Sequence, residues 1–206
     1  MRYRERDSLK SREDILRAAE EEFSEKGFFG TRVDEIANKA NINKRMIYEY
    51  FGNKEELYKA VLSDSYSKLS RAELVLLSKD APVTESIKQI VKLYFEFLKT
   101  NPSYVNLIMW ENLNKGKYIE GIDLSSIKDP VFEILKSILK KGKKEKVFKN
   151  ELDEEQLILS LLTFTFSYFS NRYTLSKLLD IKLEDDENIA RRIEYVTDMF
   201  LAYISA

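Results

Sequence analysis

The sequence predicts an all-α protein, and three observations support this fold class. Apolar residues recur at helical intervals along nearly the whole chain of 206 residues, and strand-like alternation is hard to find. Only 6 glycines and 3 prolines occur, so long loops are not expected. Helix-capping patterns follow one another from Ser11 onward. About nine helices are expected: three short ones, a longer connector and a larger bundle.

The first two helices are defined by their ends. The first is expected to begin at Ser11, a good N-cap, and to end at Gly27. Thr31 with Asp34 resembles a capping box at the start of the second. This helix stops before Asn41, a residue type that tolerates the left-handed turn conformation. Its apolar stripe consists of Val33, Ile36, Ala37 and Ala40.

The next two helices have clear caps. Asn43 is the expected N-cap of a third short helix, from residue 44 to about residue 50, and Gly52 ends it. Asn53 caps the longer connector, expected over residues 53–78. We therefore divide the chain into a helix-turn-helix domain (1–52), this connector, and a larger helical domain (79–206).

The later helices follow the same logic. Asx-Pro pairs at residues 101–102 and 129–130 each predict a helix start, because proline suits the first helical position. Asp153 starts a long apolar helix that is expected to reach Lys177. The final amphipathic helix is expected over residues 186–206.

The composition excludes several classes of function. Neither cysteine nor histidine occurs, so disulfides, thiolate metal sites and the usual His-dependent catalytic groups are absent. The charged N-terminus resembles no signal peptide, and no apolar run approaches a membrane span. We expect a cytoplasmic protein that is not an enzyme, needs no cofactor or metal, and makes no membrane contact.

One segment departs from the mixed charge of the rest. The chain has a formal net charge of −1, yet no acid occurs from Lys39 through Tyr48. Two short helices joined by a tight turn have the outline of a helix-turn-helix, whose second helix enters the major groove of DNA. Caps and a small core explain the asparagines and isoleucines equally well; they do not explain the missing acids.

The segment from Gly27 to Leu62 also resembles the DNA-binding signature of TetR-family transcriptional regulators. The matching positions, all in register, are Gly27, Phe28, Thr31, Ile36, Ala37, Tyr48, Tyr50, Phe51, Lys54 and Leu57. The turn differs, with Ala-Asn-Ile-Asn at residues 40–43 in place of the common Ala-Gly-Val-Ser. Met46 stands where a small residue or Thr is frequent in the family. This difference bears on which operator sequence is bound, not on whether DNA is bound.

The candidate DNA contacts combine both lines of reasoning. Asn and Arg read bases by hydrogen bonds, and Lys contacts bases or phosphates. Tyr50 suits a phosphate contact, and so does Lys54 at the N-terminus of the fourth helix, where free N–H groups favour anions. The candidates are Thr31, Asn43, Lys44, Arg45, Met46, Tyr48, Tyr50 and Lys54.

The resemblance further implies a homodimer that binds a palindromic operator in double-stranded DNA and a small-molecule effector. Aromatic residues crowd two of the later helices and fit either a plain core or an apolar ligand site. An apolar or aromatic effector is expected. The effector candidates are Tyr94, Phe97, Tyr104, Trp110, Phe164, Thr165, Tyr168, Asn171 and Arg172.

The last two helices are the candidates for the dimer interface, because together with their symmetry mates they would form a four-helix bundle. The candidate interface residues are Leu161, Phe169, Ile193, Val196 and Phe200.

Together these features predict a ligand-responsive transcriptional regulator, with repression the leading interpretation. One alternative is a DNA-bound structural or division-control protein of the same fold that regulates no promoter. Another is an enzyme or lipid carrier, which would not need the basic, acid-free helix.

Overall fold

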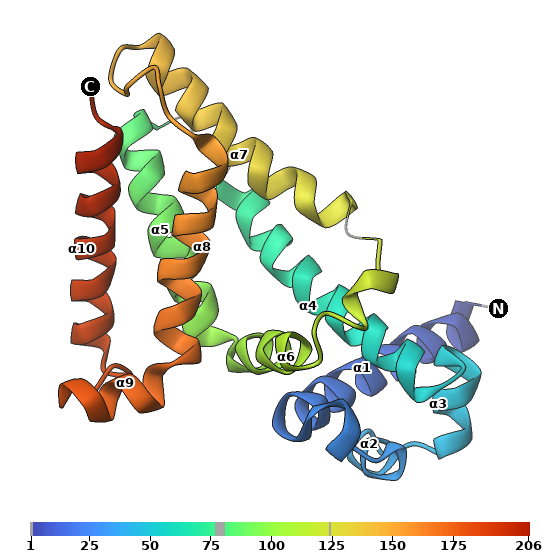
Figure 1. Ribbon diagram of the computed structural model, residues 1–206. Helices are drawn as coiled ribbons and strands as arrows, with labels where there is room; N and C mark the ends of the chain where they lie inside the picture. Colours follow the sequence, from blue (N-terminus) through green and yellow to red (C-terminus); the bar gives the residue numbers. More distant parts are fainter. Residues whose placement is uncertain (1, 77–80, 124) are drawn as a thin grey trace. The chain divides into compact units, whose positions relative to one another are not determined.

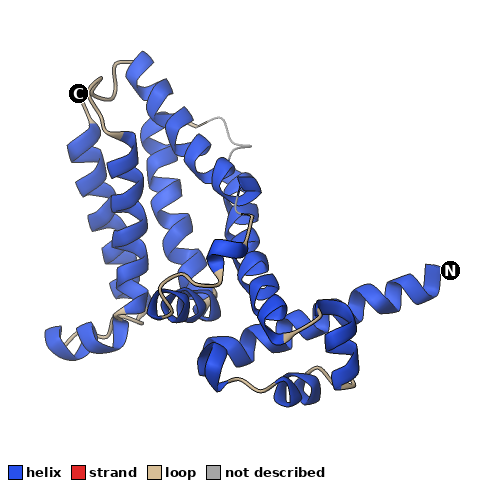
Figure 2. Ribbon diagram, turned by 45° about the vertical axis from the view of Figure 1, so that its right-hand side comes forward, coloured by secondary structure: helices blue, strands red, loops and turns tan. Residues whose placement is uncertain are grey.

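The computed structural model describes residues 2–76, 81–123 and 125–206, with side chains described for 9–74, 81–123 and 133–206. In these ranges the chain forms ten α-helices and one 3₁₀ helix, and no strand longer than an isolated bridge (Figure 2). The all-α prediction is confirmed. No helix in the described ranges is long and apolar enough to span a membrane.

The chain forms two compact units. The first comprises Met1–Ser67 and Pro102–Leu124, and the second comprises Lys68–Asn101 and Ser125–Ala206. A segment that follows the connector in sequence therefore belongs to the N-terminal unit.

The first unit contains the N-terminal helices together with α6 and a 3₁₀ helix. These are α1 (Arg2–Gly30), α2 (Val33–Lys39), α3 (Lys44–Phe51), the first part of α4 (Lys54–Leu76), α6 (Pro102–Leu113) and the 3₁₀ helix η1 (Ile119–Gly121) (Figure 1). Their shared core includes Phe23, Ile36, Ile47, Tyr58 and Leu107, one from each of five helices and all fully buried. This core fixes the angle at which α2 and α3 are presented.

The join between α1 and α2 is held by close packing. Gly27 has φ 69° and ψ 178°, a conformation that a side chain would strain. The Trp110 ring covers it, and a Cβ on Gly27 would lie 2.8 Å from that ring. Trp110 Nε1 also donates to the Ser24 carbonyl oxygen at 3.2 Å. A tryptophan of α6 therefore locks the end of α1.

The second unit is a bundle around α5 (Val83–Thr100). α5 packs against α7 (Ser125–Lys144), α8 (Glu154–Ser170) and α10 (Asp186–Ile204), while the short α9 (Arg172–Leu179) follows α8. α8 and α10 lie side by side in both views (Figures 1 and 2). In the interior, the Phe95 ring centroid lies 5.6 Å from that of Tyr168 and 5.9 Å from that of Phe169.

Most predicted caps are confirmed. The side chains of Asn43, Asn53 and Asp153 accept hydrogen bonds from backbone N–H groups two or three residues later. Asn41 is left-handed, with φ 54°, and Pro102 is the first residue of α6. Local sequence is sufficient for these features because each cap uses atoms within three residues.

Three predicted boundaries are wrong. The capping box of α2 is shifted by one residue: Glu35 Oε2 accepts from the Arg32 N–H at 3.3 Å. α7 begins at Ser125, so Pro130 lies in its second turn, where the helix forgoes one backbone hydrogen bond. α1 begins before Ser11; its predicted end at Gly27 is confirmed as a kink, because Gly27 has non-helical backbone angles and a separate short helical segment follows it to Gly30.

The long helix predicted to reach Lys177 is interrupted at Asn171. The Asn171 Nδ2 group donates to the Ser167 carbonyl oxygen at 3.1 Å and contacts the Ser167 and Ser170 hydroxyls. Such side chains compete with the helix backbone for its hydrogen-bonding groups. The helix therefore ends at Ser170, and α9 starts separately.

Candidate nucleic-acid interface and ligand cavity

The helix-turn-helix is formed by α2, a turn at residues 40–43, and α3. The Ile42 N–H donates to the Ala37 carbonyl oxygen at 3.0 Å, which closes the turn behind left-handed Asn41. On α3, Ile47 and Phe51 face the core. The opposite face of α3 is consequently turned outward.

That outward face carries the predicted reading residues. The Arg45 side chain is 84% exposed, and Tyr48 is 42% exposed. Lys44 lies at the first position of α3, with its ammonium 6.0 Å from the Tyr48 ring centroid. Met46, also on α3, is half-buried. Four predicted residues thus share one short helix that presents charge and an aromatic edge.

Both cations of α3 are paired with exposed acids. Lys44 Nζ lies 2.8 Å from Asp34 Oδ1, and Arg45 Nε lies 2.9 Å from Glu49 Oε1. The hydrogen bond to Asp34 is the main reason that the pKa of Lys44 is raised. Ion pairs this exposed contribute little to stability. Phosphate oxygens can replace these carboxylates without a large loss.

Arg32 was not among the residues predicted from the sequence. It is exposed at the N-cap of α2, and its charge lies close enough to oppose the rise in the pKa of Lys44. The sequence signal was its position between Thr31 and the acid-rich first turn of α2. Its exposure adds a cation to this face.

The remaining predicted DNA contacts have structural duties. Thr31 is 2% exposed, and its hydroxyl donates to the Gly27 carbonyl oxygen at 2.8 Å. Asn43 caps α3. Lys54 Nζ donates to the Thr31 carbonyl oxygen at 2.5 Å and lies 4.7 Å from the Phe28 ring centroid. Burial lowers the pKa of Lys54. Tyr50 is half-buried on α3.

A buried charge cluster fixes α1 against α2. Glu22 is 6% exposed and accepts from Lys26 Nζ at 2.6 Å and from Lys39 Nζ at 2.9 Å. The hydrogen bond from Lys26 is the largest cause of a lowered Glu22 pKa, and burial opposes it. Lys39 lies at the end of α2, so this cluster sets the position of the turn.

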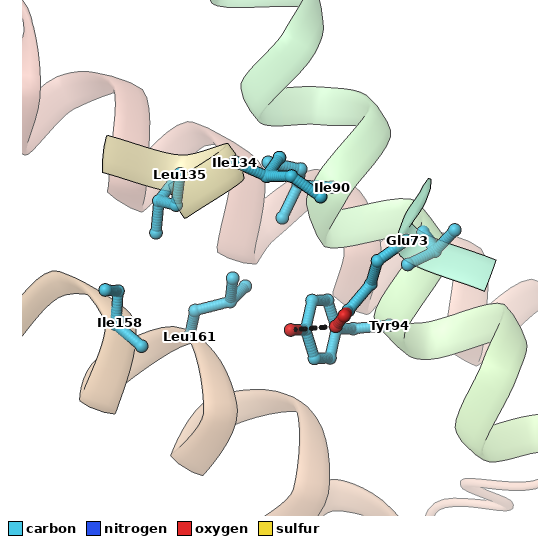
Figure 3. Close-up of a pocket in the computed structure, with 8 residues that line it drawn as sticks. Glu73, Ile90, Tyr94, Ile134, Leu135, Ile158 and Leu161 are labelled. Atoms are coloured by element: carbon cyan, nitrogen blue, oxygen red, sulfur yellow. Dashed lines mark hydrogen bonds between the residues drawn. The ribbon is translucent and has the colours of Figure 1, made fainter. Parts of the chain in front are cut away.

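A narrow cavity lies inside the second unit. Its lining is aliphatic apart from Glu73 of α4 and Tyr94 of α5 (Figure 3). The Tyr94 hydroxyl donates to Glu73 Oε1 at 2.5 Å. The room at its centre is about 10 Å³, close to that of one water molecule. The aliphatic residues are Ile90, Leu93, Ile134, Leu135, Ile158 and Leu161.

Of the nine predicted effector residues, Tyr94 lines this cavity. Tyr104 and Trp110 belong to the first unit. The others lie elsewhere in the second unit: Phe97, Thr165 and Tyr168 are buried, Phe164 is half-buried against Phe200, and Asn171 and Arg172 flank the α8–α9 break. Glu73 was not predicted. Its signal was an acid four residues after Leu69, on the inward stripe that begins at Leu57.

Four of the five candidate dimer residues are taken up by the core of the second unit. Leu161, Phe169, Val196 and Phe200 are buried, and Ile193 is half-buried. Seven other large apolar side chains on α8, α9 and α10 are exposed, and we call this set the outward apolar stripe. Its members are Leu159, Tyr173, Leu178, Leu179, Tyr195, Met199 and Tyr203.

Family models match both parts of the chain. Residues 15–61 match the model described as bacterial regulatory proteins, tetR family. Residues 82–200, more than half of the chain, match the tetracyclin repressor-like C-terminal domain. The first match contains α2 and α3, and the second contains most of the cavity lining.

Individual relatives agree over nearly the full length. The HTH-type transcriptional repressor NicS of Pseudomonas putida is 30% identical over 193 residues, 93% of this chain and 91% of the relative. The regulator RutR of Escherichia coli K12 is 27% identical over 185 residues, 88% of this chain and 84% of that protein.

Solved structures show the same fold. The fatty acid degradation regulator FadR of Bacillus halodurans superposes with a TM-score of 0.72 at 19% identity, covering 92% of this chain and 94% of that one. FadR of Bacillus subtilis, solved in complex with stearoyl-CoA, gives 0.70 at 20% identity, covering 92% and 97%. With the helix-turn-helix and both family matches in place, the chain belongs to the tetR family of transcription regulators.

Proposed function

We propose that the protein is a transcriptional repressor that binds a palindromic operator as a homodimer and is released by a small apolar effector. The observation that carries the proposal is the outward face of α3, where Lys44, Arg45 and Tyr48 stand together on a capped and rigidly packed helix. The relative at 30% identity is a repressor, which supports repression over activation. No catalytic role is proposed.

DNA binding would exchange partners on this face. The N-terminal part of α3 enters the major groove, where Arg45 reaches a base edge and Lys44 a base or a phosphate. Their carboxylate partners, Glu49 and Asp34, are exposed and are released to water. The backbone of α3 is fixed by its N-cap and its two core residues before DNA arrives, so little backbone entropy is lost on binding.

Lys54 and Tyr50 act on the DNA backbone in this proposal. Lys54 Nζ uses one N–H on the Thr31 carbonyl oxygen, and an ammonium has two more for a phosphate. Replacing Lys54 removes a structural tie as well as a charge. A Lys54 variant should therefore weaken binding to all DNA sequences alike.

The outward apolar stripe on α8, α9 and α10 is the proposed dimer surface. Large apolar side chains such as Leu178, Tyr195 and Tyr203 are more than half exposed there. Side-by-side helices with an uncovered apolar face form a four-helix bundle when a second copy packs against them. Two reading heads would then fit half-sites about 34–36 Å apart.

Helix α4 provides the link between effector and DNA. It places Tyr58 in the core of the first unit and Glu73 in the cavity of the second. An effector that enters the cavity changes the packing of α4 at Glu73. Coupling is reciprocal, so an effector that weakens DNA binding must itself bind less tightly to the DNA-bound form.

Selection of binding sites from random double-stranded DNA tests the proposal. We expect a palindrome, and we expect Lys44→Ala/Arg45→Ala to weaken its binding by at least about tenfold. The control is Lys88→Ala/Lys92→Ala, which removes the same charge from exposed positions on α5. Equal binding by both double variants would overturn the assignment of α3. Enrichment of many unrelated sequences would instead indicate a DNA-bound structural protein.

A further inference from the structure

We propose that Glu73 is the recognition group of the cavity, and that the effector is an apolar molecule with one protonated nitrogen. The regulatory meaning of this inference rests on the proposed function. The binding chemistry rests on the cavity alone.

The cavity combines an apolar lining with one buried carboxyl group. Glu73 is 3% exposed, and the side chains around it come from α5, α7 and α8 as well as α4 (Figure 3). Ile90 and Ile134 lie on one side and Ile158 and Leu161 on the other. An apolar pocket with one placed polar group is the usual design of a small-molecule site.

The two oxygens of Glu73 differ. Oε1 accepts from the Tyr94 hydroxyl, whereas Oε2 is buried and has no hydrogen-bond partner among the described residues. Native proteins rarely leave a buried polar atom in this condition without a ligand, an ion or a water. Oε2 therefore marks the point where a donor on the ligand fits.

Electrostatics selects the kind of donor. Burial and the Tyr94 hydroxyl are the influences that shift the pKa of Glu73, and no described lysine or arginine is among them. Burial raises the pKa of Glu73 to about 7, although the hydrogen bond from Tyr94 opposes the rise. A cation entering the cavity stabilises the ionised carboxylate, an anion is repelled, and a neutral hydroxyl gains only an ordinary hydrogen bond.

The small size of the cavity connects binding to movement. Its centre has room for about one water molecule, so a larger ligand must part the aliphatic side chains around it. Packed interiors resist such expansion and shift whole elements instead. Since Glu73 lies on α4, the helix that also enters the core of the first unit, ligand entry and the regulatory response would involve the same helix.

The test uses three probes of nearly equal shape: 4-butylbenzylammonium, 4-butylbenzyl alcohol and 4-butylbenzoate. Affinities are measured by calorimetry at pH 8 for the full chain and for Glu73→Gln. This substitution keeps the shape of the side chain and an oxygen for Tyr94. We expect the unchanged protein to prefer the ammonium over the alcohol by at least about tenfold, and Glu73→Gln to lose that preference.

The controls separate charge from folding. Glu96→Gln makes the same change at an exposed position of α5 and should leave all three affinities unchanged. Circular dichroism and thermal melting establish that Glu73→Gln is folded. Alcohol binding within about threefold of the unchanged protein would show that its cavity is intact.

Several results would overturn the inference. These are no ammonium binding at millimolar concentration, equal or tighter binding of the alcohol or the benzoate, or an ammonium affinity that Glu73→Gln leaves unchanged. DNA binding is measured separately. If the protein binds no DNA but binds the ammonium through Glu73, the repressor proposal is rejected and the binding site is retained. If it binds DNA but not the ammonium, the repressor proposal is retained and the binding site is rejected.

Discussion

Glu22 in the first unit and Glu73 in the second are both glutamates removed from water, at 6% and 3% exposure, yet their surroundings are opposite. Glu22 accepts from two lysine ammonium groups, and its pKa is lowered. Glu73 accepts from one neutral tyrosine hydroxyl, and its pKa is raised to about 7. Solvent exposure is similar, but desolvation dominates at Glu73, whereas the lysine hydrogen bonds outweigh it at Glu22.

The difference indicates that Glu22 has a structural role, whereas Glu73 is available for the proposed ligand binding. The Glu22 cluster connects α1 with the end of α2 and fixes the turn that presents α3. Nothing in that cluster is left for a ligand. Glu73 keeps one oxygen without a partner in the described structure, and a folded protein retains such a group at a cost in stability. If the cavity binds the proposed effector, this cost leaves an oxygen available to that ligand.

The largest expected effect is the pH dependence that Glu73 causes. Its folded pKa of about 7 lies above the ordinary value of 4.5, so between these values the folded state holds a proton that the unfolded state has lost. Stability therefore falls as pH rises through this window, by up to about 3 kcal/mol at pH 8. Glu73→Gln should lack this loss, and urea denaturation from pH 4 to 8 measures it.

The decisive quantity is the change with pH, because the buried amide of Glu73→Gln adds a penalty of its own at every pH. Glu96→Gln, on the exposed face of α5, should follow the unchanged protein throughout. If the free energy of unfolding varied with pH in the same way for the unchanged protein and Glu73→Gln, the pKa of Glu73 would not be raised in the folded state. The comparison with Glu22 would then fail.

Glu22 should show the opposite sign and a smaller effect. Its lowered pKa stabilises the folded state above the unfolded value of 4.5, and this contribution is lost as pH falls through the lowered folded pKa. Glu22→Gln should destabilise the protein by about 1–2 kcal/mol at pH 7, since its lysine partners are partly exposed and screened. Once the pH is below the lowered folded pKa, the two proteins should converge.

Chemical denaturation at pH 3 and pH 7 measures the Glu22 effect. Glu21→Gln provides the matched control, because Glu21 also pairs with Lys39 but from a half-exposed position. A loss for Glu21→Gln equal to that for Glu22→Gln would place the stabilisation in the surface pair instead of the buried one.

The local sequence predicted the ends and the outward face of α3 well. The caps at Asn43 and Asn53 and the left-handed Asn41 use only atoms within a few residues, so their residue types determine them. The outward position of Tyr48 follows from the helical period once Ile47 and Phe51 are taken as core. No long-range contact is needed for any of these.

The cavity beside Glu73 could not be predicted in the same way. Trp110 is a residue type typical of effector contacts, but its ring packs against Gly27, which lies 83 positions earlier in the sequence. In the sequence, Glu73 cannot be distinguished from the many solvated acids of this charged chain. Its burial results from side chains of α5, α7 and α8, which lie far from it in the sequence. The outward apolar stripe of α8, α9 and α10 likewise depends on how these helices pack against α5, which the helical period alone does not determine.

The smallest expected effect concerns an acid that is exposed and paired on the reading helix. Glu49 holds Arg45 through an i, i+4 pair at 2.9 Å, and its charge would also face DNA phosphates. Glu49→Gln removes that repulsion and frees Arg45, so operator affinity should rise by about two- to fivefold, less at high salt. Gel-shift titrations at two salt concentrations measure the change. Glu96→Gln is again the control, because Lys92 and Glu96 form an i, i+4 pair on α5. If Glu49→Gln bound DNA less tightly, Glu49 would be positioning Arg45 for its base contact, and this exposed pair would act like the Glu22 cluster.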